Sequence, residues 1–78
     1  MQKYIVDTVA LRKLMVEKGY YTISALAKTS KVHRNTLGKV LDGSLRPSVE
    51  VMDKLSDALE MGPETSGRVF FVPVLRNT

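Results

Sequence analysis

The chain has 78 residues, enough for a single domain with a thin core that dimerisation would help to stabilise. It contains no cysteine and one histidine, His33, which excludes disulfides, thiolate metal sites and histidine metal clusters. The net charge is +4 and is unevenly distributed: residues 22–46 hold five basic residues against one acidic residue, whereas residues 47–60 hold four acidic residues against one lysine. This pattern is typical of a protein with one surface facing a polyanion, although many small domains are mildly basic without binding nucleic acid.

Membrane and secretory segments are not expected. No apolar run approaches the roughly 18 residues of a membrane span. The segment Met1–Val6 is too short and too mixed for a secretory signal. We therefore expect a cytoplasmic protein without membrane contact.

The first expected elements are a short strand or frayed end at residues 2–6 and a helix at residues 9–18. Asp7 or Thr8 can cap this helix, because a short side-chain oxygen accepts from the unpaired N–H groups of the first turn. Gly19 ends it. The apolar residues at helical spacing on one face are Ala10, Leu11, Leu14 and Met15.

Two short helices follow with a tight break between them. Thr22 caps a helix at residues 23–29, in which Leu26 and Ala27 turn inward. After the break at residues 30–32, a helix at residues 33–41 carries three apolar residues, Leu37, Val40 and Leu41.

A fourth helix begins after Ser48, a good N-cap, and ends at Gly62-Pro63. Its apolar residues are Met52, Leu55 and Leu59. The sequence thus predicts a mainly α fold of four short helices. We expect a helical domain at residues 1–61 and a tail at residues 62–78.

The segment Arg68–Leu75 is rich in β-branched and aromatic residues, which predicts a strand that ends near Pro73 or lies at a sheet edge. Its apolar residues, which we expect in a dimer interface, are Val69, Phe70, Phe71, Val72 and Val74. The strand can pair with the N-terminal segment or with the same strand of a second subunit. Pairing across a dimer is the favoured alternative, and a simple packing tail is the third.

Residues 22–59 resemble the phage repressor and Cro-type (XRE class) helix-turn-helix family. The matching residues fall in the family's order without a gap and are Thr22, Leu26, Ala27, Ser30, Val32, Arg34, Thr36, Leu37, Lys39, Val40, Gly43, Pro47, Ser48, Glu50, Lys54, Leu55, Ala58 and Leu59. The resemblance implies a lambda-repressor-like fold whose third helix enters the major groove of DNA. The C-terminal strand is closest in style to Cro-like proteins.

By this resemblance, five residues face the groove and contact bases, namely His33, Arg34, Asn35, Gly38 and Lys39. Arg34 is expected at a guanine and Asn35 at an adenine. Gly38 allows close approach of the backbone, and Lys39 can reach a base or a phosphate. His33 stands where the family usually has a serine N-cap, and the alternatives for it are a phosphate contact or an exposed substitute without contact. The expected phosphate contacts are Thr22, Lys28, Ser44 and Arg46.

The chain departs from the family at four places. Lys31 stands where a glycine with positive φ is usual, so either a non-glycine residue there costs around 1 kcal/mol or the turn differs slightly. Ile23 replaces a polar residue that often contacts DNA, and the Tyr20-Tyr21 link is one residue longer than usual. Many relatives also end in a fifth helix, where this chain is expected to form a strand.

An enzyme is not expected, because the chain has no convincing nucleophile–base arrangement and no glycine-rich phosphate loop. The favoured function is a dimeric repressor that binds an imperfect palindrome in double-stranded DNA, without cofactor or metal. Phage or prophage regulation follows only by analogy. The alternative is an antitoxin or anti-repressor type of protein-binding module that grips a partner protein with residues 68–75.

Overall fold

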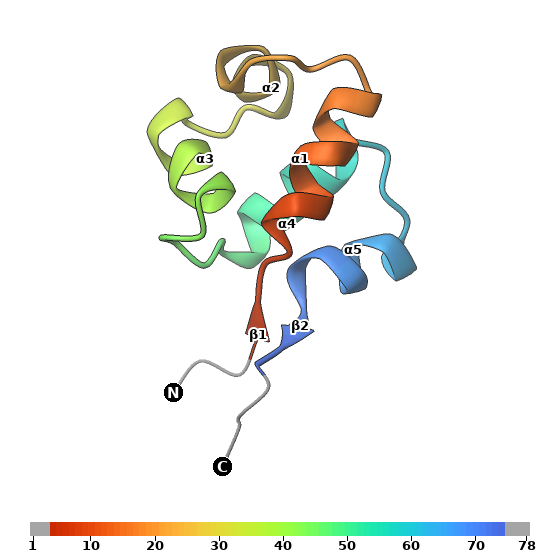
Figure 1. The fold of residues 1–78 in the computed structure, drawn as a ribbon. Helices are drawn as coiled ribbons and strands as arrows, with labels where there is room; N and C mark the ends of the chain where they lie inside the picture. The colour runs from red at the N-terminus through yellow and green to blue at the C-terminus, as the bar shows by residue number, and fades with distance from the viewer. Residues whose placement is uncertain (1–3, 75–78) are drawn as a thin grey trace.

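The structure, a computed structural model, describes residues 4–74 as five helices and one small antiparallel sheet (Figure 1). The helices are α1 (Thr8–Glu17), α2 (Ile23–Ser30), α3 (Arg34–Leu41), α4 (Val49–Ala58) and α5 (Pro63–Phe70). The strands are β1 (Tyr4–Ile5) and β2 (Val72–Pro73). The prediction of a mainly α fold with a C-terminal strand is confirmed, but the number of helices is five and not four.

Short polar side chains start three of the helices. Asp7, Thr22 and Ser48 accept hydrogen bonds from the backbone N–H three residues later, at 3.0, 3.1 and 3.2 Å. Each bond satisfies a donor that the first helical turn leaves without a partner. The starts predicted for α1, α2 and α4 are therefore confirmed.

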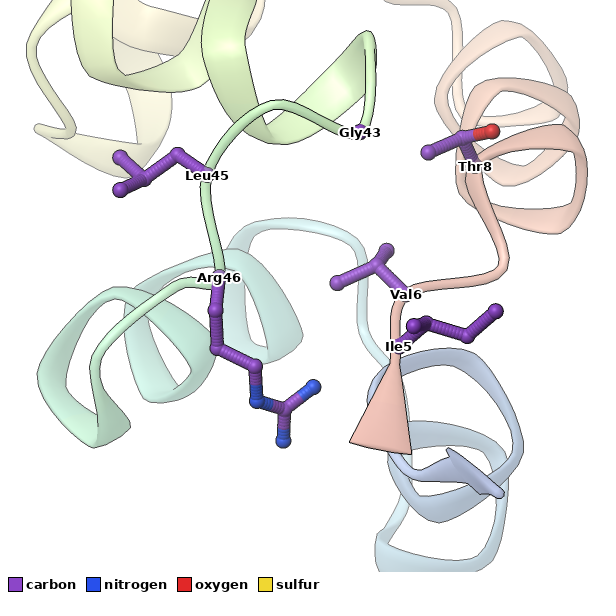
Figure 2. Close-up of a pocket in the computed structure, with 6 residues that line it drawn as sticks. All are labelled: Ile5, Val6, Thr8, Gly43, Leu45 and Arg46. Atoms are coloured by element: carbon purple, nitrogen blue, oxygen red, sulfur yellow. The ribbon is translucent and has the colours of Figure 1, made fainter. Parts of the chain in front are cut away.

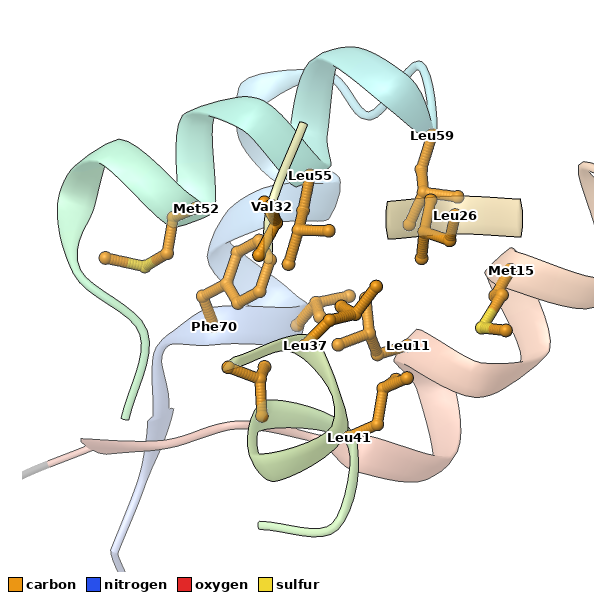
Figure 3. Close-up of a cluster of buried hydrophobic side chains, with 12 residues drawn as sticks. Leu11, Met15, Leu26, Val32, Leu37, Leu41, Met52, Leu55, Leu59 and Phe70 are labelled. Carbon is orange, nitrogen blue, oxygen red and sulfur yellow. The ribbon is translucent and has the colours of Figure 1, made fainter. Parts of the chain in front are cut away.

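The helices share one hydrophobic core (Figure 3). The buried hydrophobic side chains among the described residues are Leu11, Met15, Leu26, Val32, Leu37, Val40, Leu41, Met52, Leu55, Leu59, Val69 and Phe70. Leu26 of α2 and Leu37 of α3 are both 0% exposed, and Val32 between the two helices is 4% exposed. These buried residues hold α2 and α3 at a fixed angle.

The turn between α2 and α3 requires a left-handed backbone at Lys31, where φ is 64° and ψ is 25°. The predicted positive φ at this position is therefore confirmed. The Lys31 N–H donates to the Ala27 carbonyl oxygen at 2.9 Å, and the buried Ser30 hydroxyl accepts from the Val32 N–H at 3.3 Å. A non-glycine residue pays about 1 kcal/mol for this conformation.

The predicted strand over residues 68–75 is wrong for residues 68–70, which belong to α5. Pro63 in the first turn has a φ suited to helix initiation, and Arg68 pairs with Glu64 one turn earlier at 2.7 Å. Helical geometry turns Val69 and Phe70 into the core, where they are 2% and 0% exposed. This burial overrides the strand preference of the same residues.

The strand that does form pairs within the chain. Tyr4 lies opposite Pro73 and Ile5 opposite Val72, so pairing with the N-terminal segment is the alternative that the structure supports. The rings of Tyr4 and Phe71 meet edge to face, with centroids 5.7 Å apart. Residues 2 and 3 of the expected first strand, and Leu75 of the expected last one, lie outside the described residues.

Phe70 is completely buried in the core, whereas the next residue, Phe71, is 45% exposed. The two phenylalanines should therefore differ sharply in their contribution to stability. Phe70→Ala should lower the free energy of unfolding by about 3–5 kcal/mol, because it leaves a cavity. Phe71→Ala should cost about 1 kcal/mol, mainly through its ring contact with Tyr4. Urea denaturation followed by circular dichroism measures both, and equal losses would contradict the helical assignment of residue 70.

Candidate nucleic-acid interface

Helix α3 has an apolar face and an exposed face. Leu37, Val40 and Leu41 are at most 1% exposed and pack into the core beside α2. Arg34 and Asn35 lie on the other side and are exposed. The helical period separates the two sets, so the burial of one set directs the other to solvent.

An open groove runs along the exposed face of α3. Its lining residues are Arg12, Ile23, Arg34, Asn35, Gly38, Lys39 and Asp42. Four of the five predicted base-contacting residues are therefore brought together in one groove. The fifth, His33, precedes the helix and caps it: its Nδ1 accepts from the Asn35 N–H at 3.1 Å. In the neutral ring the proton then sits on Nε2, which can donate to an oxygen of DNA.

Gly38 lies in the middle of this groove and is not required by packing inside the chain. A Cβ atom placed there would meet only the Cδ1 atom of Ile23, at 4.0 Å, which is ordinary van der Waals contact. Ile23 itself is half-buried and packs against the core. The groove wall on the α2 side is thus apolar at this point.

Arg12 also lines the groove and is not among the contacts predicted from the sequence. It belongs to α1, and its Nε–H donates to the carbonyl oxygen of Leu41 at 3.1 Å. The two residues are separated by 29 positions in the chain. No local motif signals such a contact, since only the packing of α1 against the end of α3 creates it.

The comparisons with known proteins agree with this geometry. Residues 10–65 match the family model of the Cro/C1-type HTH DNA-binding domain. The chain belongs to this family. The match extends from α1 into the first turn of α5 and includes every residue of the α3 groove. Searches of the curated proteins and of the solved structures gave no match.

Membership of the Cro/C1-type family makes the chain a DNA-binding protein of the helix-turn-helix kind. None of the helices within residues 4–74 is long and apolar enough to cross a membrane. In the same range, no three His, Cys, Asp or Glu side chains are grouped as metal ligands would be.

Thr22 and Lys28, two of the predicted phosphate contacts, have free hydrogen-bond donors at α2. The Thr22 hydroxyl oxygen accepts from Ala25, and its own O–H can still donate to a phosphate. Lys28 is exposed on α2, and it does not line the α3 groove. Both assignments stay predictions.

The donors of Ser44 are already in use. Its backbone N–H donates to Asp42 Oδ1 at 2.8 Å, and its hydroxyl donates to the same oxygen. The structure therefore leaves Ser44 no side-chain donor for a phosphate in this arrangement. Its role here is to hold the turn that ends α3.

Arg46 is also engaged within the chain. Its guanidinium donates to the Phe70 carbonyl oxygen and lies 5.0 Å from the centre of the Phe71 ring. Figure 2 shows Arg46 extending from the α3–α4 loop toward β1, beside a pocket that Ile5 and Val6 also line. Arg46 thus links this loop to the C-terminal segment, and its predicted phosphate contact stays a prediction.

The five predicted dimerisation residues divide into two groups. Val69 and Phe70 are buried inside the single chain and reach no surface. Phe71 and Val74 are 45% and 41% exposed, and Val72 is half-buried in β2. Only the second group is placed where another molecule can contact it.

The Asp42 carboxylate at the end of α3 should make stability depend on pH. Hydrogen bonds from the Ser44 hydroxyl and the Ser44 N–H lower the pKa of Asp42 below its ordinary value of 3.8, and the charges of Arg12 and Lys39 add to the effect. A lowered pKa in the folded state stabilises the protein above the pKa of the unfolded chain, and this contribution disappears as the pH falls through the folded value.

Asp42→Asn should therefore be less stable than the unsubstituted protein at neutral pH, and the difference should shrink below about pH 4. The asparagine oxygen still accepts from Ser44, so the variant removes mainly the charge. Thermal unfolding between neutral and acidic pH measures the difference. Asp53→Asn on α4 controls for the loss of one exposed negative charge, and a difference for Asp42→Asn that did not vary with pH would contradict the assignment.

Proposed function

We propose that the protein is a dimeric repressor that binds a palindromic operator in double-stranded DNA with α3 in the major groove. The observation that carries the proposal is the groove in which Arg34, Asn35 and Lys39 lie together on the exposed face of α3. A major groove admits one α-helix, and base edges there are distinguished by their donors and acceptors. Binding of this kind occludes a promoter, so repression is the expected outcome.

The side chains of the groove match the donors and acceptors of base edges. Arg34 suits guanine, where a guanidinium donates to both O6 and N7, and Asn35 suits the N6 and N7 positions of adenine. Lys39 reaches a base or a phosphate. His33 can donate from Nε2 to the backbone, since Nδ1 is occupied by the Asn35 N–H.

Gly38 supports close approach of DNA to the helix. Glycine costs a helix about 1 kcal/mol relative to alanine. Packing inside the chain gives no reason for that cost, because a Cβ atom there would have room. Close contact between the α3 backbone and a base or sugar is the reason we propose.

A dimer would use the apolar surface around the sheet and the start of α4. Phe71 and Val49 are exposed and line one groove between α4 and α5, with Val74 exposed just beyond β2. In such a dimer we expect the two copies of α3 to lie in successive major grooves, about 34 Å apart. The resemblance to phage repressors and Cro suggests a phage or prophage gene as the target.

The same surface supports a second candidate, an antitoxin or anti-repressor that holds a partner protein. The observation in its favour is that Phe71 and Val74, on either side of the two-residue strand β2, are exposed. Phe71 also lines the groove between α4 and α5. A monomer in sedimentation experiments would favour this candidate, and a dimer would favour the repressor.

Selection of bound duplexes from a random pool, at near-physiological salt, tests the proposed function. The unsubstituted protein should enrich an imperfect palindrome with two equal half-sites about one helical turn apart. The Arg34→Ala variant should lose the preference for one guanine in each half-site, at a cost of about 1–3 kcal/mol.

Lys28→Ala is the matched control for Arg34→Ala, because it removes an exposed positive charge on α2 that does not line the α3 groove. It should weaken all sequences alike. Loss of affinity without loss of base preference in Arg34→Ala would make Arg34 a phosphate contact. Failure of the unsubstituted protein to enrich any sequence would overturn the proposed function.

Gly38→Ala should raise the stability of the protein but lower its affinity for DNA. The variant should gain about 1 kcal/mol in the free energy of unfolding, since alanine is the better helix former and its Cβ has space. Affinity for the selected operator should nevertheless fall. Thermal unfolding and fluorescence anisotropy measure the two quantities, and an unchanged affinity would show that DNA does not approach this position closely.

A further inference from the structure

Arg12 reaches the α3 groove from outside the helix-turn-helix pair. It lies on α1, and together with Asp42 and Lys39 it lines the groove where α3 ends. Its Nε–H bond to the Leu41 carbonyl oxygen joins α1 to the last turn of α3. Carbonyl groups at a helix end have no partner within the helix, so this bond has a structural purpose of its own.

The bond to Leu41 uses only part of the guanidinium. Arginine has five N–H donors in a planar fork, and the bond at Nε leaves the four terminal ones for other acceptors. The same bond fixes the plane of the fork, which lowers the entropy lost when a second partner binds. A phosphate accepts two parallel N–H bonds from such a fork.

Among residues 4–74, no carboxylate forms an ion pair with Arg12. The ion pairs within residues 4–74 are Lys18–Glu60, Lys54–Glu50 and Arg68–Glu64. Asp42 is close enough for the charge of Arg12 to lower its pKa, but its Oδ1 accepts from Ser44. Arg12 therefore brings a positive charge to the groove in a fixed orientation.

We propose that Arg12 is a phosphate-binding residue that anchors the DNA backbone at the C-terminal end of α3. The inference rests on the proposed function, because it requires DNA to lie along the α3 groove. A phosphate is the expected partner, since Arg34 and Asn35, the proposed guanine and adenine contacts, lie in the first turn of α3 and backbone contacts fix the position of a protein on the duplex. Arg12 would thus connect α1 directly to the DNA.

The test compares Arg12→Gln with Lys13→Gln. Glutamine can still donate to the Leu41 oxygen but carries no charge. Lys13 is the next residue on α1, is exposed, does not line the groove and undergoes the same change of charge. Binding to a mixed-sequence duplex of about three helical turns is followed by fluorescence anisotropy over a series of NaCl concentrations.

Arg12→Gln should weaken binding several-fold and reduce the slope of log K against log salt by about one. Lys13→Gln should change the slope by less than half as much. Equal changes in the two variants would overturn the inference and leave Arg12 only its structural bond. In the unsubstituted protein, the Arg12 Nε–H signal in NMR spectra should shift when the duplex is added, and an unchanged signal would overturn the inference even if Arg12→Gln failed to fold.

The outcomes also separate the inference from the proposed function. If the unsubstituted protein binds no duplex, the proposed function fails and the inference fails with it. If Arg34→Ala alters base preference while Arg12→Gln leaves the salt slope unchanged, only the inference fails.

Discussion

The burial of one face of α3 determines what its other face can do. Leu37 and Val40 are completely buried and fix the rotation of the helix about its own axis. Burial of each such side chain contributes about 1.5–3 kcal/mol to stability. A rotation of α3 that exposed them would lose this contribution and would also bury polar side chains at a cost. Arg34 and Asn35 therefore stay at the surface, and the position of the groove along α3 follows from the packing of the core.

The end of α5 helps to hold α1, α3 and α4 together. Phe70 completes the core beneath α4, and its carbonyl oxygen accepts from Arg46 in the loop that follows α3. The Asp7 N–H donates to the Val69 carbonyl oxygen at 2.7 Å, which joins the start of α1 to the same segment. The last turn of α5 thus binds both the start of α1 and the loop between α3 and α4. Phe71 and Val74 remain exposed beside it.

Local signals in the sequence predict most of the fold and the main part of the interface. Capping residues such as Thr22 and Ser48 mark helix starts, and helical spacing separates the core face of α3 from its groove face. The errors arise where distant contacts decide. Val69 and Phe70 are residues that favour a strand, but they are helical because this places them in the core. Arg12 lies in the groove because it contacts Leu41, which is 29 positions away.

The proposed function requires the exposed face of α3 to contact DNA. Hydrogen–deuterium exchange of the protein, measured by mass spectrometry with and without a selected duplex, tests it most directly. DNA should slow exchange in peptides covering residues 33–42, with no comparable change within residues 49–58 of α4. Slower exchange confined to residues 63–74, with residues 33–42 unaffected, would contradict it.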